Sequence, residues 1–170
     1  PPPPVPIPPA TGPYKMPPAV SGGEFLEYGG KAWKTHIEFL TEGKMEIQIF
    51  PGGALGNPLK VTDTVKSGVA EMGYTAMAYD WGVDPTTALF NGYAGHRDPV
   101  IHAHWVYEGG GMELWQQFRD EKFGVVSIPL FLIPAEVGLH SRKPIRTIED
   151  FKGLKLRTAG AWNEISQEFG

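Results

Sequence analysis

The stretch Met45-Glu46-Ile47-Gln48-Ile49-Phe50-Pro51-Gly52-Gly53-Ala54-Leu55-Gly56 joins a strand pattern to a turn. Apolar and polar residues alternate over 45–50, which predicts a half-buried strand. The Pro-Gly-Gly sequence at 51–53 predicts a turn. A helix is then expected over 58–67, with Gly68 ending it. A strand followed by a short turn and a helix is the repeating unit of an α/β fold.

The glycines of this turn predict tight backbone geometry rather than a phosphate site. Residues 52–56 lack the lysine of a P-loop, and their glycine spacing differs from the dinucleotide-binding fingerprint. Glycine makes a sharp strand-to-helix turn sterically easy.

The flanking segments continue the alternation of strands and helices. Residues 14–16 predict a short strand, and 24–40 predict a helix with apolar side chains at three- and four-residue steps. With 45–50, 58–67 and a strand-like run over 69–77, the order becomes strand, helix, strand, helix, strand. This order favours an α/β fold with a largely parallel sheet.

The second half of the chain is less regular. Residues 100–120 have helical character, interrupted by the glycines at 109–111. The apolar run 125–133 predicts a buried strand or a crossing between two lobes. A short strand over 154–156 and a helix from Ala161 complete the expected elements.

Composition excludes several functional classes. The 170 residues carry a net charge of −4 with acids and bases interspersed, which is not the pattern of a nucleic-acid-binding surface. The absence of cysteine excludes disulfides and thiol nucleophiles. Residues 1–13 are expected to be a disordered proline-rich tail, serving as a tether or as a ligand for a proline-binding domain. Since Pro1 is not an initiator residue, we expect a processed chain or a fragment.

A histidine group invites a metal-dependent hydrolase as an alternative function. His102 and His104, with His96 and Asp98 nearby, would share a metal if the segment were a strand. On a helix, residues two apart point in different directions and cannot do so. The sequence leaves both conformations open.

Aromatic residues gather in the middle of the chain, which suits either a ligand cleft or an aromatic core. The group consists of Tyr74, Tyr79, Trp81, Phe90 and Tyr93.

The segment 147–160 combines a capped turn with an arginine. Thr147 and Asp150 have the spacing of a capping box, and Gly153 is expected to end the turn in a left-handed conformation. Arg157 follows, where its guanidinium would hold a carboxylate with two parallel hydrogen bonds. The alternative is an ordinary surface arginine.

An ordered series of motifs resembles the solute-binding subunit of TRAP transporters, the DctP-like family, and in particular its 2-oxoacid-binding branch. The motifs are IFPGGALG (49–56), KSGVAEM (66–72), AYDWG (78–82), GGGMEL (109–114), KPI (143–145) and DFKGLKLRT (150–158). The resemblance implies a periplasmic-binding-protein-like fold of two α/β lobes, with the first lobe at 14–124. Residues 125–170 would then hold the crossing strand and an incomplete second lobe.

The resemblance also implies a capture mechanism without enzymatic chemistry. A small organic acid, a 2-oxo or 2-hydroxy monocarboxylate, would be trapped between the lobes. It would then pass to TRAP permease subunits in the membrane. The protein would be secreted to the periplasm, with its signal peptide outside these residues, and a homodimer is compatible with the family. No nucleic-acid partner is expected.

Site residues follow from the same resemblance. Arg157 matches the arginine that clamps the ligand carboxylate, and Tyr79, with Tyr74 and Trp81, would line the cleft. Glu136 stands where that branch usually has a glutamine that contacts ligand and cation. A sodium or calcium ion beside the ligand is therefore implied, with Glu136 as its ligand.

Overall fold

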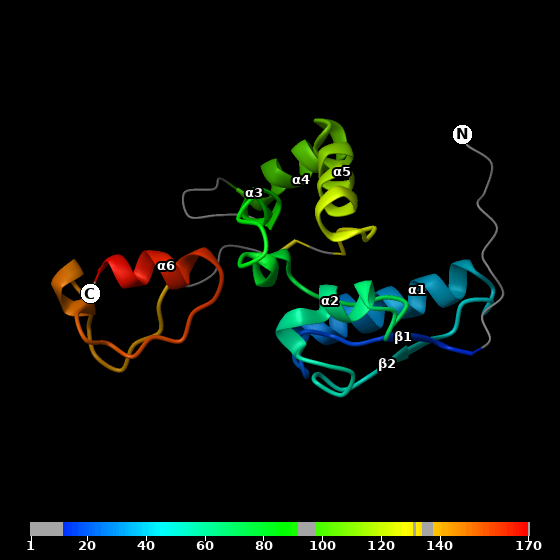
Figure 1. The fold of residues 1–170 in the computed structure, drawn as a ribbon, viewed down its shortest axis with the longest axis horizontal. Coiled ribbons are helices and arrows are strands. Elements are labelled where there is room, and N and C mark those ends of the chain that lie inside the picture. Colours follow the sequence, from blue (N-terminus) through cyan, green and yellow to red (C-terminus); the bar gives the residue numbers. More distant parts are fainter. Residues whose placement is uncertain (1–11, 92–97, 131, 134–137, 170) are drawn as a thin grey trace. The chain divides into compact units, whose positions relative to one another are not determined.

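The computed structural model describes residues 12–91, 98–130, 132–133 and 138–169 (Figure 1). Contacts within the chain divide it between Thr75 and Ala76 into two units, each described by itself below. The expected lobe boundary after residue 124 stays a prediction. No helix among the described residues is both long and apolar enough to cross a membrane.

The first unit is built on a parallel pair of strands. Strand β1, Tyr14–Met16, pairs with β2, Ile47–Ile49, so that Tyr14 faces Ile47 and Met16 faces Ile49. Met16 and Ile47 are each 1% exposed and lie at the centre of this unit's core. Both predicted strands and their parallel direction are confirmed, although β2 is shorter than the alternating pattern.

The strand-like run predicted over 69–77 is wrong, except for one isolated bridge between Pro18 and Tyr74. The Tyr74 N–H donates to the Pro17 carbonyl at 3.1 Å, and the Ala19 N–H donates to the Tyr74 carbonyl at 2.7 Å. Pro17 and Pro18 have no N–H of their own, so a continuous ladder cannot form beside them.

A long helix covers residues 25–40 in the first unit, close to the predicted 24–40. Its first turns are a π-helix, Phe25–Lys31, and the rest is the α-helix α1, Ala32–Leu40. Gly30 lies in the π-helical part, and a Cβ there would meet Leu26 Cδ1 at 3.2 Å. The close approach of these groups explains a glycine inside a helix.

The second predicted helix begins as a 3-10 turn, Pro58–Lys60, and continues as α2, Val61–Lys66. Asn57 caps it by accepting a hydrogen bond from the Leu59 N–H at 2.9 Å. Gly68 follows with φ +74°, a left-handed conformation that ends the helix as predicted.

The second unit is helical in the part that the structure describes. It contains the 3-10 helix η3, Met77–Asp80, followed by α3, Thr87–Asn91, α4, Pro99–Glu108, and α5, Gly111–Phe123. A 3-10 turn η4, Ile148–Phe151, and α6, Ala161–Glu168, complete it. The predicted helical region with a glycine break is therefore confirmed as α4 and α5.

Aromatic rings form the core of this unit. The Phe90 ring lies 5.2 Å from Phe118, 5.9 Å from Trp115 and 6.1 Å from Trp105, measured between ring centroids. Phe90 is 7% exposed. Of the two interpretations of the aromatic group, core packing accounts for Phe90.

The described residues of 125–133 and of 154–156 form no strand, so the strand predictions are wrong there, while the crossing between two lobes stays a prediction. Val126 and Ile128 are 81% and 63% exposed, and the backbone there turns back to α5 instead of joining a sheet. The Val125 N–H donates to the Arg119 carbonyl at 3.4 Å, and the Ser127 N–H donates to Gln116 Oε1 at 3.3 Å. An apolar run becomes a strand only where another strand accepts its hydrogen bonds.

Candidate functional site

The predicted aromatic residues Tyr79 and Trp81 lie on the turn formed by η3. The Tyr79 N–H donates to the Ala76 carbonyl at 3.1 Å, and the Ala78 N–H donates to Asn91 Oδ1 at 3.2 Å. Both aromatic side chains are half-buried. The turn is therefore held by its own hydrogen bonds and by α3, while its rings keep part of their surface accessible.

A buried ion pair anchors the same turn. Asp80 stands between the two aromatic residues, and its Oδ2 lies 2.6 Å from Arg119 Nη1 on α5. The side chains are 8% and 3% exposed, respectively. Sequence reasoning missed this pair, although Arg119 falls four residues after Trp115 and four before Phe123. That spacing places it on the aromatic face of α5.

Arg119 makes two further contacts from the same guanidinium. Its Nε donates to Ser127 Oγ at 3.0 Å, and its Cζ lies 4.2 Å from the centroid of the Phe123 ring. The planar group can bond in two directions while stacking on a ring, which lysine cannot do.

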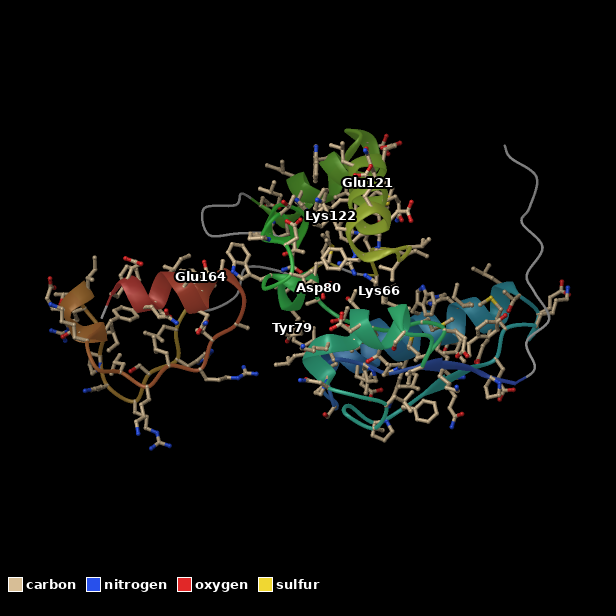
Figure 2. The ribbon with its side chains drawn as sticks, viewed as in Figure 1. Lys66, Tyr79, Asp80, Glu121, Lys122 and Glu164 are labelled. Atoms are coloured by element: carbon tan, nitrogen blue, oxygen red, sulfur yellow. The ribbon has the colours of Figure 1, made fainter. Side chains whose placement is uncertain are left out.

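Arg157 lies in the exposed connection between η4 and α6. A few residues after Arg157, this connection contacts the η3 turn that carries Tyr79 and Trp81. Gly160 has φ +60°, and a Cβ there would lie 3.2 Å from the Ala78 carbonyl oxygen. Trp81 Nε1 donates to Glu164 Oε1 at 2.7 Å, and Glu164, labelled in Figure 2, lies in the first turn of α6. Contacts at Ala78 and Trp81, before and after Tyr79, thus connect the turn that carries Tyr79 to the segment that follows Arg157.

The turn before Arg157 is built as predicted. Thr147 and Asp150 form a capping box, and Gly153 has φ +70°. Asp150 Oδ2 accepts hydrogen bonds from the Arg146 N–H at 2.8 Å and the Thr147 N–H at 3.0 Å. These bonds stabilise the charged carboxylate and hold the pKa of Asp150 below its usual value.

Tyr74 belongs to the first unit and is 7% exposed. Its hydroxyl donates to the Phe25 carbonyl at 2.8 Å. Burial raises the pKa of Tyr74 to about 12. Packing in the core accounts for this residue, and its role in lining a cleft stays a prediction.

Four predictions fall wholly or partly on residues outside the described part of the chain. Glu136, with its expected contact to ligand and cation, lies there, as do His96 and residues 1–11 of the predicted proline-rich tail. Tyr93 lies there too.

The histidine cluster is not assembled in the part of the chain that the structure describes. His102 and His104 lie two residues apart on α4, so their side chains point in different directions. His102 Nε2 lies 3.0 Å from the Phe90 carbonyl oxygen. No group of three or more histidine, cysteine or acidic side chains able to hold a metal occurs among the described residues. The hydrolase alternative is unsupported.

The curated proteins similar to this chain include two periplasmic binding proteins. A monocarboxylate 2-oxoacid-binding periplasmic protein from Nostoc sp. is 28% identical over 148 residues, covering 87% of this chain and 40% of that protein. A 2,3-diketo-L-gulonate-binding periplasmic protein from Escherichia coli is 28% identical over 133 residues, covering 75% of this chain and 38% of that protein. The chain therefore spans well under half the length of these relatives.

Solved structures show the same fold. A TRAP periplasmic solute-binding protein from Pseudoalteromonas atlantica, with bound sodium and pyruvate, matches with a TM-score of 0.84 and 28% identity. One from Colwellia psychrerythraea, with bound calcium and pyruvate, matches with a TM-score of 0.81 and 28% identity. Each match covers 92% of this chain and 48% of the other. The predicted fold class is confirmed over the compared part.

A family model decides membership, because it matches most of the chain. The model for bacterial extracellular solute-binding protein, family 7, covers residues 21–170. That span includes the ordered motifs, the Asp80–Arg119 pair and Arg157. The chain belongs to the DctP family of extracellular solute-binding proteins.

Proposed function

We propose that this chain is part of the solute-binding subunit of a TRAP transporter that captures a small monocarboxylate, a 2-oxo or 2-hydroxy acid. The observation that carries the proposal is the match to two TRAP solute-binding proteins, one with bound sodium and pyruvate and the other with bound calcium and pyruvate. The membership of the chain in the DctP family supports the same class of function.

Arg157 is the proposed carboxylate clamp. Its guanidinium is exposed, and α6 begins four residues later with Ala161. A guanidinium offers two parallel hydrogen bonds to a carboxylate, and the positive end of a helix favours an anion nearby. Tyr79 and Trp81 would supply the apolar walls that orient the rest of a small ligand.

Glu136 is the proposed cation ligand. A carboxylate prefers hard cations such as sodium or calcium, and such an ion would offset the repulsion between Glu136 and an anionic ligand. Capture of this kind makes and breaks no covalent bond, so we infer no enzymatic activity. Its expected partners are TRAP permease subunits, and its expected place is the periplasm. A homodimer is part of the same proposal.

Isothermal titration of pyruvate tests the function on the natural polypeptide that carries residues 1–170. Titrations run with sodium, with calcium and with neither ion. Arg157→Ala removes a charge-assisted bidentate contact, so we expect affinity to fall by about tenfold to a hundredfold. Arg142→Ala is the matched control, because it removes the same charge from an exposed position in the same region.

Two results would contradict the proposal. If none of a panel of 2-oxo and 2-hydroxy monocarboxylates binds under any of these ion conditions, the proposed ligand class is wrong. If ligands bind and Arg157→Ala has the affinity of Arg142→Ala, the clamp is a different residue.

A further inference from the structure

We propose that Arg119 is a positioning residue for the ligand site: it holds the turn that carries Tyr79 and Trp81 in a fixed relation to residues 125–127. This inference rests on the proposed function, because it assigns Arg119 a task in the same site. Arg119 itself touches no ligand in this proposal. Its effect passes through Asp80 and Ser127.

Asp80 lies within the turn that carries the two aromatic residues. This residue ends η3 and lies directly between the two aromatic residues in the sequence. Its carbonyl also accepts hydrogen bonds from the Val83 N–H at 2.9 Å and the Asp84 N–H at 3.2 Å. The backbone of Asp80 is therefore part of the turn that carries Tyr79 and Trp81, and its side chain is the point at which Arg119 holds that turn.

The Arg119 guanidinium contacts Asp80 and Ser127 through different nitrogen atoms. Its Nη1 lies 2.6 Å from Asp80 Oδ2, whereas its Nε lies 3.0 Å from Ser127 Oγ. The guanidinium is planar, and Phe123 lies under it at 4.2 Å. Two bonds and one stacked ring fix the orientation of the group, so it sets the distance between Asp80 and Ser127.

A second residue of α5, Gln116, also binds Ser127. The Gln116 side-chain amide contacts the Ser127 backbone in both directions: Nε2 donates to the Ser127 carbonyl, and Oε1 accepts from the Ser127 N–H. Gln116 lies three residues before Arg119, on the same face of α5. Helix α5 thus connects the turn that carries Tyr79 and Trp81 to residues 125–127.

Positioning of the turn by Arg119 can be distinguished from a contribution of the ion pair to stability alone. A buried ion pair replaced by apolar residues of similar volume often leaves a protein equally stable. Such a replacement keeps the packing but loses the directed bonds that orient Asp80. The double change Arg119→Met with Asp80→Leu should therefore fold, yet place the aromatic turn less well.

The experiment measures both orientation and affinity. The Trp81 indole N–H is followed by two-dimensional nitrogen–proton NMR without ligand, with its resonance assigned through Trp81→Phe. Pyruvate affinity is measured by titration in the presence of sodium. The matched control is Glu121→Gln, which removes an exposed charge from the same helix (Figure 2).

We expect the double variant to shift or broaden the Trp81 indole resonance and to weaken pyruvate binding by about threefold to tenfold. Glu121→Gln should change neither. If the double variant does not fold, Arg119→Lys replaces it. Lysine keeps the charge but loses the fork, and the same two changes are expected.

A folded variant with an unchanged Trp81 resonance and wild-type affinity would overturn the inference. If the wild-type protein does not bind pyruvate, the proposed ligand fails while the resonance still reports on positioning. A shifted resonance with unchanged pyruvate affinity would mean that Arg119 orients the turn without serving the ligand site, which also overturns the inference.

Discussion

Replacing Arg119 with methionine removes the cation from a buried ion pair while keeping a side chain of comparable length. The Asp80 carboxylate, 8% exposed, loses a partner at 2.6 Å. Ser127 Oγ loses a donor at 3.0 Å, and the Phe123 ring loses the cation above it. The change therefore isolates charge and hydrogen bonding from volume.

The magnitude follows from burial. Breaking a buried pair by removing one partner costs about 3–5 kcal/mol, because the remaining charge stays in a poorly solvated place. Methionine fills most of the vacated space, so the cost of a cavity adds little. A loss of about 3–5 kcal/mol is a large share of the ~5–15 kcal/mol that stabilises an ordinary domain.

Urea denaturation followed by far-UV circular dichroism measures the difference. Arg119→Met should lower the free energy of unfolding by about 3–5 kcal/mol, and adding Asp80→Leu should recover most of that loss. The double variant is the decisive comparison, because it removes the same bonds without leaving a buried charge. A single variant that loses less than ~1 kcal/mol, or a double variant no more stable than the single, would refute this reasoning.

Three further predictions concern packing and protonation. Gly73→Ala should destabilise the first unit by about 1–3 kcal/mol in urea denaturation, because the new Cβ would clash with Val61 Cγ1. Gly22→Ala, where nothing lies within 4 Å, is the control and should be near neutral; equal losses would contradict the packing. Asp150→Asn should remove a stability contribution that is present at neutral pH and lost as pH falls through the depressed pKa of Asp150. Denaturation curves that differ from wild type equally at low and neutral pH would contradict this. Tyr74 should titrate near pH 12 in ultraviolet absorbance, and because its pKa is raised on folding, stability should fall as pH rises above about 10. The fall should be smaller in Tyr74→Phe, and an equal fall would contradict the assignment.

The local rules of helix formation and capping succeeded where all the partners lie within a few residues. Asp150 accepts from the Thr147 N–H three residues away, so the capping box could be read from spacing alone. Gly68 and Gly153 adopt the left-handed conformation expected at the end of a helix or turn.

The strand predictions failed where partners lie far apart in the chain. An apolar run over 125–133 has the composition of a strand, but Ser127 bonds to Gln116 on α5 instead. Prolines next to β1 likewise reduce the run over 69–77 to one bridge. Hydrophobic pattern shows that a segment can pair, and only the surrounding structure supplies the pairing partner.

For the candidate site, the order of motifs, the family resemblance that they carry and the choice of Arg157 as the proposed clamp could all be read from the sequence. This was possible because those signals are local and sequential. Tertiary structure alone decided that Asp80 meets Arg119, 39 residues away, and that Trp81 meets Glu164, 83 residues away. Neither pair has a spacing that any helix or turn would bring together, so only the packing of α5 and α6 against η3 makes the contacts.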